Sequence, residues 1–343
     1  MSYLKKLIVW ALLCGALGAG FVLLFELTAR LVMPEHVANL RKSYFYDARI
    51  SFISPGAFQT KRGYSNFRPN SSVREVALYP DASGKLTLEY DCSYRSDALG
   101  FVSNDIAYEN AEILLLGDSI GQGVGGCSWM GRLSPEVRSR IYSAAVLGHG
   151  VLNWKSVVEE LETIKKPSKL LIIFITHDFV RPNWWFDAGQ LQCLELKGSC
   201  AGKYWYPIDD RMLETGAVRY RERIPTNYAA PWRSKMKYHL IASYGLYSAF
   251  FGQARVASQT FGPSVEAMLS LAKRYDLRLI WVNDRWEANR PNSGSVRLLE
   301  KLRDLNVLRC RIPPTGFLPR DGHPNAQGYD ALVACVEKVV RDW

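Results

Sequence analysis

The chain of 343 residues carries a formal charge of +10, and 48% of its residues are hydrophobic. This length and apolar content suffice to bury one large core or two modest ones, and the 16 prolines and 26 glycines are ordinary usage, which excludes a largely disordered protein. The positive charge comes without a dense Lys/Arg block or a nucleic-acid motif. We therefore expect no nucleic-acid partner and an anionic surface or polymer instead.

The amino terminus begins with an apolar segment. Leu7 to Phe25 are 19 consecutive uncharged residues that follow two lysines. A helix of this length spans a hydrocarbon core, and the lysines favour a cytoplasmic amino terminus. A cleaved signal peptide is the alternative, because residues 16–18 loosely resemble a cleavage site. Since the apolar run continues beyond that site, we favour an uncleaved anchor over residues 1–33.

Seven cysteines indicate the redox environment. Cys14 lies inside the apolar segment, and six more cysteines follow it. An even count beyond an export signal predicts disulfides in an oxidising compartment. Ranked by proximity in sequence, the expected pairs are Cys193–Cys200, Cys310–Cys335 and Cys92–Cys127. The alternative to disulfides is that these cysteines are buried free thiols. The sequence contains no C-x₂-C spacing, so it gives no indication of a zinc site.

Residues 34–110 are aromatic and polar, with turn signals at 54–56 and 81–84. Short strands are predicted at 73–78 and 86–90. We interpret this stretch as an amino-terminal accessory segment, and its composition indicates no function.

From residue 111 to residue 343, apolar strands alternate with amphipathic helices. The strands are predicted at 113–116, 141–147, 170–175 and 277–282, and the helices at 151–164, 265–275 and 326–340. This alternation predicts an α/β fold, a three-layer sandwich with a central parallel sheet covered on both faces. Ligand sites in such folds lie at the carboxyl ends of the strands, where Ser119, Gly148 and His177 fall.

A long insertion interrupts this pattern at about 179–262. It contains aromatic side chains and a basic stretch at 232–237. Loops of this length are functional or disordered, and aromatics beside Arg and Lys suit a sugar chain that carries carboxylates. Candidate substrate-binding residues are Trp184, Trp185 and Asp178. The alternative is that the aromatics only pack the insertion onto the core.

The strand at 113–116 ends at Gly117 and is followed by Asp118 and Ser119. This pattern predicts a buried strand that delivers one hydroxyl to the edge of the sheet. A serine becomes a nucleophile when a positioned base takes its proton. Taken alone, an ordinary strand-to-turn junction has the same pattern.

His323 is the best candidate base among the five histidines. It lies in a Pro- and Gly-containing loop that leads into the last predicted helix. Asp321, two residues earlier, is placed to orient the ring and stabilise its protonated form. Taken alone, this loop also fits an ordinary helix entry.

Together the two stretches resemble the SGNH (GDSL-type) hydrolase superfamily. The matching residues are Gly-Asp-Ser at 117–119, Gly-Gln-Gly-Val at 121–124 and, far downstream, Asp-Gly-His-Pro-Asn at 321–325. The order of the blocks is that of the family, and the resemblance spans about 111–343 with the insertion unmatched. Residues 94–101 also resemble the segment before the nucleophile in many exported bacterial members. The resemblance implies a flavodoxin-like sheet and no cofactor or metal.

The resemblance implies a role for each matching residue. Ser119 corresponds to the nucleophile, and its own N–H to one oxyanion donor. Gly148 corresponds to the block that supplies a second backbone N–H. His323 corresponds to the general base and Asp321 to its partner, although the family usually places that acid three residues before the histidine instead of two.

The third block departs from the family. An asparagine side chain is expected to donate to the oxyanion after the central strand, but the chain has Ile-Thr-His-Asp at 175–178. A histidine N–H donates in the same direction, so we expect His177 to replace the asparagine. Loss of one such donor costs about 3 kcal/mol of transition-state stabilisation. A weakly active site is the alternative.

The implied function is a serine-dependent esterase or acyltransferase that acts on O-acetyl groups of envelope or exported polysaccharide through an acyl-serine. The implied location is the bacterial inner membrane, with a single span and the catalytic domain facing the periplasm. Expected partners are the acylated carbohydrate, the membrane, and a membrane acyltransferase or polysaccharide-export machinery. The alternatives are a lipase or thioesterase acting on membrane lipids, and a non-catalytic polysaccharide-binding protein that retains the fold.

Overall fold

The computed structural model describes residues 3–34, 37, 50–54, 57–80, 86–102, 104–181, 240, 242–243, 261–287, 293–319 and 321–343. The chain divides into two compact units. One consists of Met1–Ala48 and Arg221–Gln259, and the other of Arg49–Tyr220 and Thr260–Trp343.

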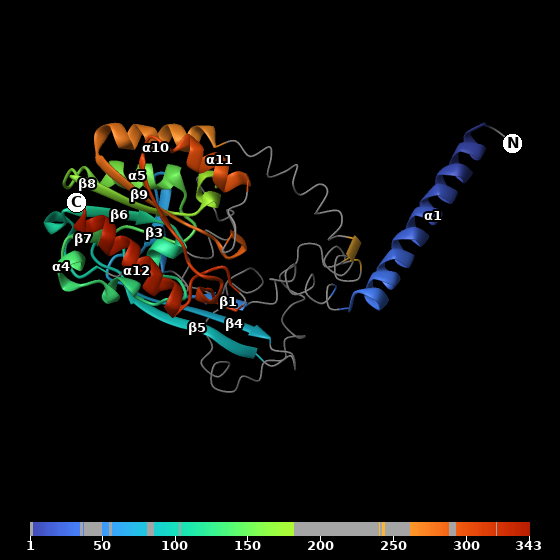
Figure 1. Cartoon of the computed structure of the whole chain (residues 1–343), viewed down its shortest axis with the longest axis horizontal. Helices are drawn as coiled ribbons and strands as arrows, with labels where there is room; N and C mark the ends of the chain where they lie inside the picture. The colour runs from blue at the N-terminus through green and yellow to red at the C-terminus, as the bar shows by residue number, and fades with distance from the viewer. Residues whose placement is uncertain are drawn as a thin grey trace. The chain divides into compact units, whose positions relative to one another are not determined.

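The first unit contains helix α1 (Tyr3–Val32), which includes the predicted apolar segment (Figure 1). Its stretch Leu13–Val32 has a mean hydropathy of 1.6 and is long enough to cross a membrane. A membrane span and a signal sequence share this composition. Most of its apolar side chains are exposed, as in Phe21 and Leu31.

The second unit is built on a five-stranded parallel sheet of β6 (Ile113–Gly117), β7 (Ile141–Ser143), β8 (Lys169–Phe174), β9 (Asp276–Val282) and β10 (Asn306–Cys310). The strand order is β7-β6-β8-β9-β10, and every neighbouring pair is parallel. Counted along the chain this is the flavodoxin-like order 2-1-3-4-5. The predicted α/β fold class is confirmed.

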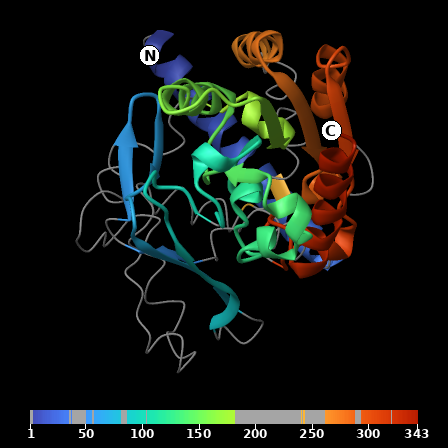
Figure 2. The same cartoon turned by 90° about the vertical axis from the view of Figure 1, so that its left-hand side faces the viewer.

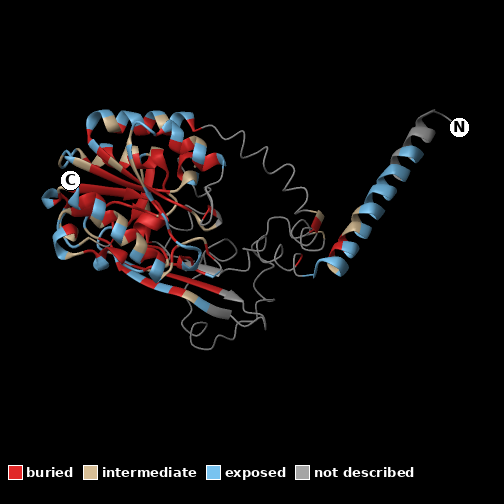
Figure 3. Cartoon of the chain, in the orientation of Figure 1, coloured by how far each residue is buried: buried red, intermediate tan, exposed pale blue. Residues whose placement is uncertain are grey.

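Helices cover both faces of this sheet, so the unit has three layers (Figures 1 and 2). One face carries α5 (Val151–Leu161), α10 (Gly262–Arg274) and α11 (Ser293–Lys301), and the other carries α4 (Pro135–Arg138) and α12 (Ala326–Arg341). Strand side chains alternate between the faces. Leu114 and Leu116 pack with the first group, whereas Ile113 and Leu115 pack with the second. Figure 3 shows the buried sheet between partly exposed helices.

Two strands differ from the sequence prediction. β7 ends at Ser143 and not at residue 147, although the N–H groups of Ala144 and Val146 still donate to carbonyls of β6. The chain then turns after Val146, whose carbonyl accepts the His149 N–H. β10 was not predicted. It lies at the sheet edge and has exposed polar positions, so its pattern lacks the continuous apolar run of the inner strands.

The accessory segment forms two small antiparallel sheets. β1 (Ile50–Ile53), β4 (Ser72–Pro80) and β5 (Leu86–Arg95) pair in the order β1-β4-β5, and β2 (Phe58–Lys61) pairs with β3 (Tyr64–Phe67). The two predicted strands are present and longer than expected. Their buried side chains share one core with the parallel sheet, as Val73 and Tyr94 do with Leu114. We call the sheet of β1, β4 and β5 the accessory sheet.

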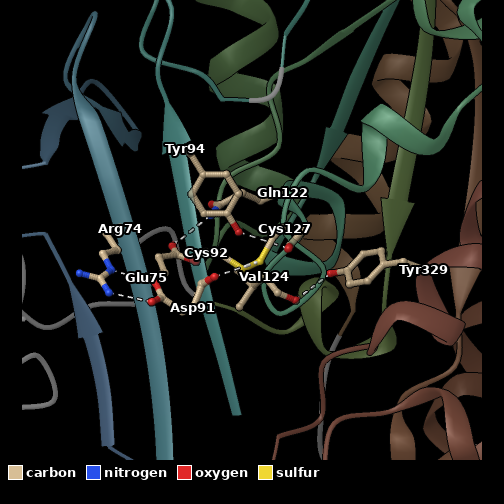
Figure 4. Close-up of a disulfide and its surroundings, with 10 residues drawn as sticks. Arg74, Glu75, Asp91, Cys92, Tyr94, Gln122, Val124, Cys127 and Tyr329 are labelled. Carbon is tan, nitrogen blue, oxygen red and sulfur yellow. Dashed lines mark hydrogen bonds and ion pairs between the residues drawn. A yellow bond between two sulfur atoms is a disulfide. The ribbon is translucent and has the colours of Figure 1, made fainter. Parts of the chain in front are cut away.

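Within the described residues, two disulfides stabilise the second unit. Cys92 bonds to Cys127 and Cys310 bonds to Cys335, with Cα–Cα distances of 5.1 and 5.9 Å. The first joins the accessory sheet to the loop after β6 (Figure 4), and the second joins β10 to α12. The predicted Cys193–Cys200 pair lies outside the described residues.

Candidate active site

Ser119 lies where β6 gives way to the short helix α3 (Ser119–Gln122). Asp118 caps this helix, because its Oδ1 accepts a hydrogen bond from the Ile120 N–H at 2.9 Å. The helix ends at Gly123 after a single turn. This abrupt strand-to-helix turn places Ser119, with 9% of its surface exposed, at the carboxyl end of β6.

His323 and Asp321 form a hydrogen-bond chain with Ser119. The Nε2 atom of His323 lies 2.7 Å from the Ser119 Oγ, and its Nδ1 lies 2.7 Å from Asp321 Oδ2. The Asp321 carboxylate is buried and accepts the hydrogen bond from His323 Nδ1. Nδ1 therefore carries the proton, and Nε2 is the acceptor for the serine hydroxyl. The two-residue gap between acid and histidine therefore brings both groups into contact.

The start of α12 holds the His323 loop in place. Asn325 caps α12, and its Nδ2 donates to the carbonyls of Thr315 and Phe317 at 2.8 and 3.1 Å. Within α12, the Tyr329 hydroxyl donates to the Val124 carbonyl at 2.9 Å (Figure 4). The last helix is thus tied directly to the chain that follows Ser119.

A buried charge cluster lies on the other side of Ser119. Arg181 Nη2 lies 3.3 Å from Asp118 Oδ2, and Arg181 Nη1 lies 3.0 Å from Asp178 Oδ1. Arg181 Nη1 also donates to the His149 carbonyl at 2.8 Å. Burial and the neighbouring Asp118 carboxyl raise the pKa of Asp178 well above its usual range, and Arg181 opposes this shift. One guanidinium therefore connects the loops after β6, β7 and β8.

The turn after β7 contains Gly148, His149 and Gly150. Gly148 has a φ of +79°, a conformation that favours glycine. The His149 Nε2 lies 2.7 Å from the Ser65 carbonyl, so it donates, and burial lowers the pKa of the ring to about 4. A Cβ on Gly150 would lie 2.7 Å from the Asp178 carbonyl oxygen. The turn therefore packs directly against the chain that follows β8.

The remaining predicted site residues differ in their exposure to solvent. His177 is exposed in the 3₁₀ turn Thr176–Phe179, which follows β8. Asp178 is fully buried, and its Oδ2 accepts the Ile175 N–H at 2.9 Å. Its carboxyl faces protein groups and not solvent, so we assign it a structural role in place of the expected substrate contact. Trp184 and Trp185 lie outside the described residues.

The strand order explains why these groups share one edge. β7 and β8 flank β6 on opposite sides, and in doubly wound sheets ligands bind where the connections diverge in this way. Ser119, Gly148 and His177 each follow one of these three strands. The sequence analysis did not identify Arg181, although a basic residue three positions after Asp178 could have indicated an ion pair between the two. Within the described ranges, no three His, Cys, Asp or Glu side chains gather as metal ligands.

Solved structures similar to this chain include a GDSL-like lipase from Bacteroides thetaiotaomicron, with 12% identity and a TM-score of 0.33; the match covers 69% of this chain and 91% of the lipase. A catalytic mutant of an acetylxylan esterase from Geobacillus stearothermophilus matches with 11% identity and a TM-score of 0.32, over 66% of this chain and 93% of the esterase. No protein-family model and no curated protein matches the chain.

Proposed function

We propose that this chain is a serine-dependent ester hydrolase or acyltransferase of the SGNH type. The observation that supports it is the continuous chain from the Ser119 hydroxyl through His323 to Asp321, with two contacts of 2.7 Å. A serine hydroxyl with an imidazole acceptor, itself oriented by a buried carboxylate, is the arrangement of an activated nucleophile.

In the proposed mechanism, Ser119 Oγ attacks the ester carbonyl carbon while its proton passes to His323 Nε2. The Asp321 carboxylate stabilises the imidazolium that forms. His323 then returns the proton to the departing alcohol, which leaves an acyl-serine. Water or a second hydroxyl attacks the acyl group, His323 accepts that proton, and Ser119 is regenerated with release of an acid or a new ester.

The negative charge that develops on the carbonyl oxygen needs hydrogen-bond donors. We assign this task to the backbone N–H groups of Ser119 and Gly148 and to the His177 side chain. All three lie at the carboxyl edge of the sheet: Ser119 follows β6, and Gly148 and His177 follow β7 and β8, the two strands that flank it. A fixed donor lowers the barrier because it is already oriented when charge forms.

The proposed substrates are O-acetyl groups of envelope or exported polysaccharide. The apolar helix α1 supports a single-pass location in the bacterial inner membrane, and the two disulfides support an oxidising compartment such as the periplasm. A membrane acyltransferase or the export machinery is the proposed partner. A lipase or thioesterase acting on membrane lipids is the second candidate, favoured by the same helix. A preference for long-chain esters over acetate would distinguish it.

The test is covalent labelling of the full-length chain in detergent with a serine-directed phosphonate fluoride, followed by peptide mapping. We expect label on Ser119, none in Ser119→Ala or His323→Ala, and undiminished label in Ser139→Ala, which alters an exposed serine remote from the sheet edge. Wild type should also release acetate from acetylated glycans. Absence of label on Ser119, with turnover equal to that of Ser119→Ala, would refute the proposed function and favour a non-catalytic glycan-binding protein.

A further inference from the structure

The accessory sheet contacts the proposed active site at several points, although none of its residues takes part in the proposed chemistry. The direct contacts reach α3 with the residue that follows it and the loop that contains Asp321, and the turn that contains Gly148 is reached through Gln122 of α3. Each direct contact involves a side chain of β4 or β5, and Figure 4 shows those of Glu75 and Tyr94. An added layer that only completed the core would need apolar contacts alone.

The first contact is a hydrogen-bond relay from β4 to the Gly148 turn. Glu75 is 3% exposed, and its Oε1 accepts a hydrogen bond from Gln122 Nε2 at 3.1 Å. Gln122 Oε1 in turn accepts the Leu147 N–H at 2.8 Å. A carboxylate only accepts, so Glu75 binds the amide nitrogen and turns the amide oxygen toward Leu147. Leu147 immediately precedes Gly148, so this relay fixes the start of that turn.

The second contact starts from an irregularity in β5. Ala77 pairs with Tyr90 but Leu78 pairs with Leu88, which leaves Glu89 as an extra residue in its strand. A β-bulge of this kind redirects a side chain, and bulges are common beside active sites. Here Glu89 Oε1 accepts the Asp321 backbone N–H at 3.0 Å. Glu89 thus holds the main chain of the residue that orients His323.

Two further links keep the sheet against the active-site loops. The Cys92–Cys127 disulfide joins β5 covalently to the chain that follows α3, and the Tyr94 hydroxyl donates to the Gly123 carbonyl at 3.3 Å. The side chains of Arg74 and Asp91 form instead a partly exposed ion pair with each other at 2.7 Å (Figure 4). Asp91 therefore offers a control on the same strand.

We propose that Glu75 and Glu89 are positioning residues, which hold the Gly148 turn and Asp321 respectively. This inference rests on the proposed function, because it assigns one glutamate to the oxyanion side and the other to the acid–base side. Each carboxylate acts through a neighbour of the site, Gln122 or the Asp321 backbone, so we expect its loss to change kcat and not substrate binding. Displacement of a reacting or stabilising group by about 1 Å lowers rates up to about 100-fold.

The test measures hydrolysis of a chromogenic acetate ester by the full-length chain in detergent. Glu75→Met and Glu89→Met remove the acceptor but keep side-chain length, and each should lower kcat about 10- to 100-fold with KM unchanged. Glu75→Gln and Glu89→Gln retain an acceptor oxygen and should recover most of the rate. Asp91→Leu, the control, should match wild type.

A double-mutant cycle tests the relay. Gln122→Met should lower kcat as Glu75→Met does, and the combined variant should lose no more than either single variant, because both break one relay. Met variants with the kcat of Asp91→Leu, in an enzyme that Ser119→Ala inactivates, would overturn the inference and leave the proposed function standing. Wild type no faster than Ser119→Ala would overturn both. Thermal unfolding of each variant shows whether a lower kcat comes from loss of folded protein. Where a Met variant is unfolded, the kcat of the corresponding Gln variant tests the inference instead.

Discussion

On one side of Ser119, His323 and Asp321 reach the hydroxyl through two direct side-chain hydrogen bonds, within a loop of three residues. On the other side, the ends of β7 and β8 are joined through the buried guanidinium of Arg181. The proposed acid–base side therefore depends on two side chains that lie two positions apart in sequence. The proposed oxyanion side depends on backbone turns that are joined by charged groups buried between separate loops.

This difference implies different consequences of substitution. A change on the acid–base side should lower kcat and leave stability nearly intact, since His323 is partly exposed and its loop is held by Asn325. A change in the buried groups of the proposed oxyanion side, Arg181 and His149, should destabilise the fold as well, because uncompensated charges or unpaired polar groups remain buried.

Asp321→Asn should cause the largest effect. The amide preserves the shape of the loop but does not stabilise the imidazolium, so we expect kcat for an acetate ester to fall about 10⁴-fold. Steady-state kinetics of the purified chain measures this loss. Asp330→Asn, which alters an exposed carboxylate on α12, is the control and should retain wild-type kcat. An unchanged kcat for Asp321→Asn would show that the acid–base side does not depend on this carboxylate.

Arg181→Met should have the next largest effect, on stability. It leaves Asp118 and Asp178 buried without their shared cation, and breaking a buried ion pair in this way costs about 3–5 kcal/mol. The free energy of unfolding in urea measures the change. Arg132→Met removes a partly exposed ion pair with Asp330 and a hydrogen bond to the Ala326 carbonyl, and should cost only about 1–2 kcal/mol. Equal losses in the two variants would contradict the assigned role of Arg181.

Acid should destabilise the oxyanion side through His149. Burial lowers the pKa of His149 from 6.5 to about 4, so between these pH values the unfolded chain binds a proton that the folded chain excludes. The free energy of unfolding should therefore fall by about 3 kcal/mol as pH drops through this window. His149→Gln retains a donor for the Ser65 carbonyl and should lack this part of the pH dependence. The same acid sensitivity in the variant would assign it to another group.

His177→Ala should have the smallest of these effects. Loss of one oxyanion donor should lower kcat about 100-fold, and stability should change little because the side chain is exposed. His177→Asn, which supplies the side-chain donor expected for the superfamily, should retain most of the rate. If His177→Ala keeps wild-type kcat, the oxyanion is held by backbone N–H groups alone.

The sequence by itself was sufficient for the α/β class and for the group around Ser119. Strands buried on both faces are continuous apolar runs, so β6, β8 and β9 are visible without knowledge of their partners. Ser119, His323 and Asp321 lie in short turn segments that together resemble the SGNH superfamily, although each segment alone also fits an ordinary turn. The Cys92–Cys127 and Cys310–Cys335 bonds followed from proximity along the chain.

Only the tertiary structure showed how the loops after β7 and β8 are joined and which side chains of the accessory sheet contact the loops around Ser119. Asp178 was expected to contact substrate, but its burial against Arg181 depends on how the ends of three strands pack. Glu75 stands among the core-facing residues of β4, a sign that it has a buried partner, but strand periodicity does not name Gln122. Likewise, the contact of Glu89 with Asp321 spans 232 positions and requires a bulge. Periodicity reports which face of an element is buried, whereas the partner on that face is set by the packing of whole sheets.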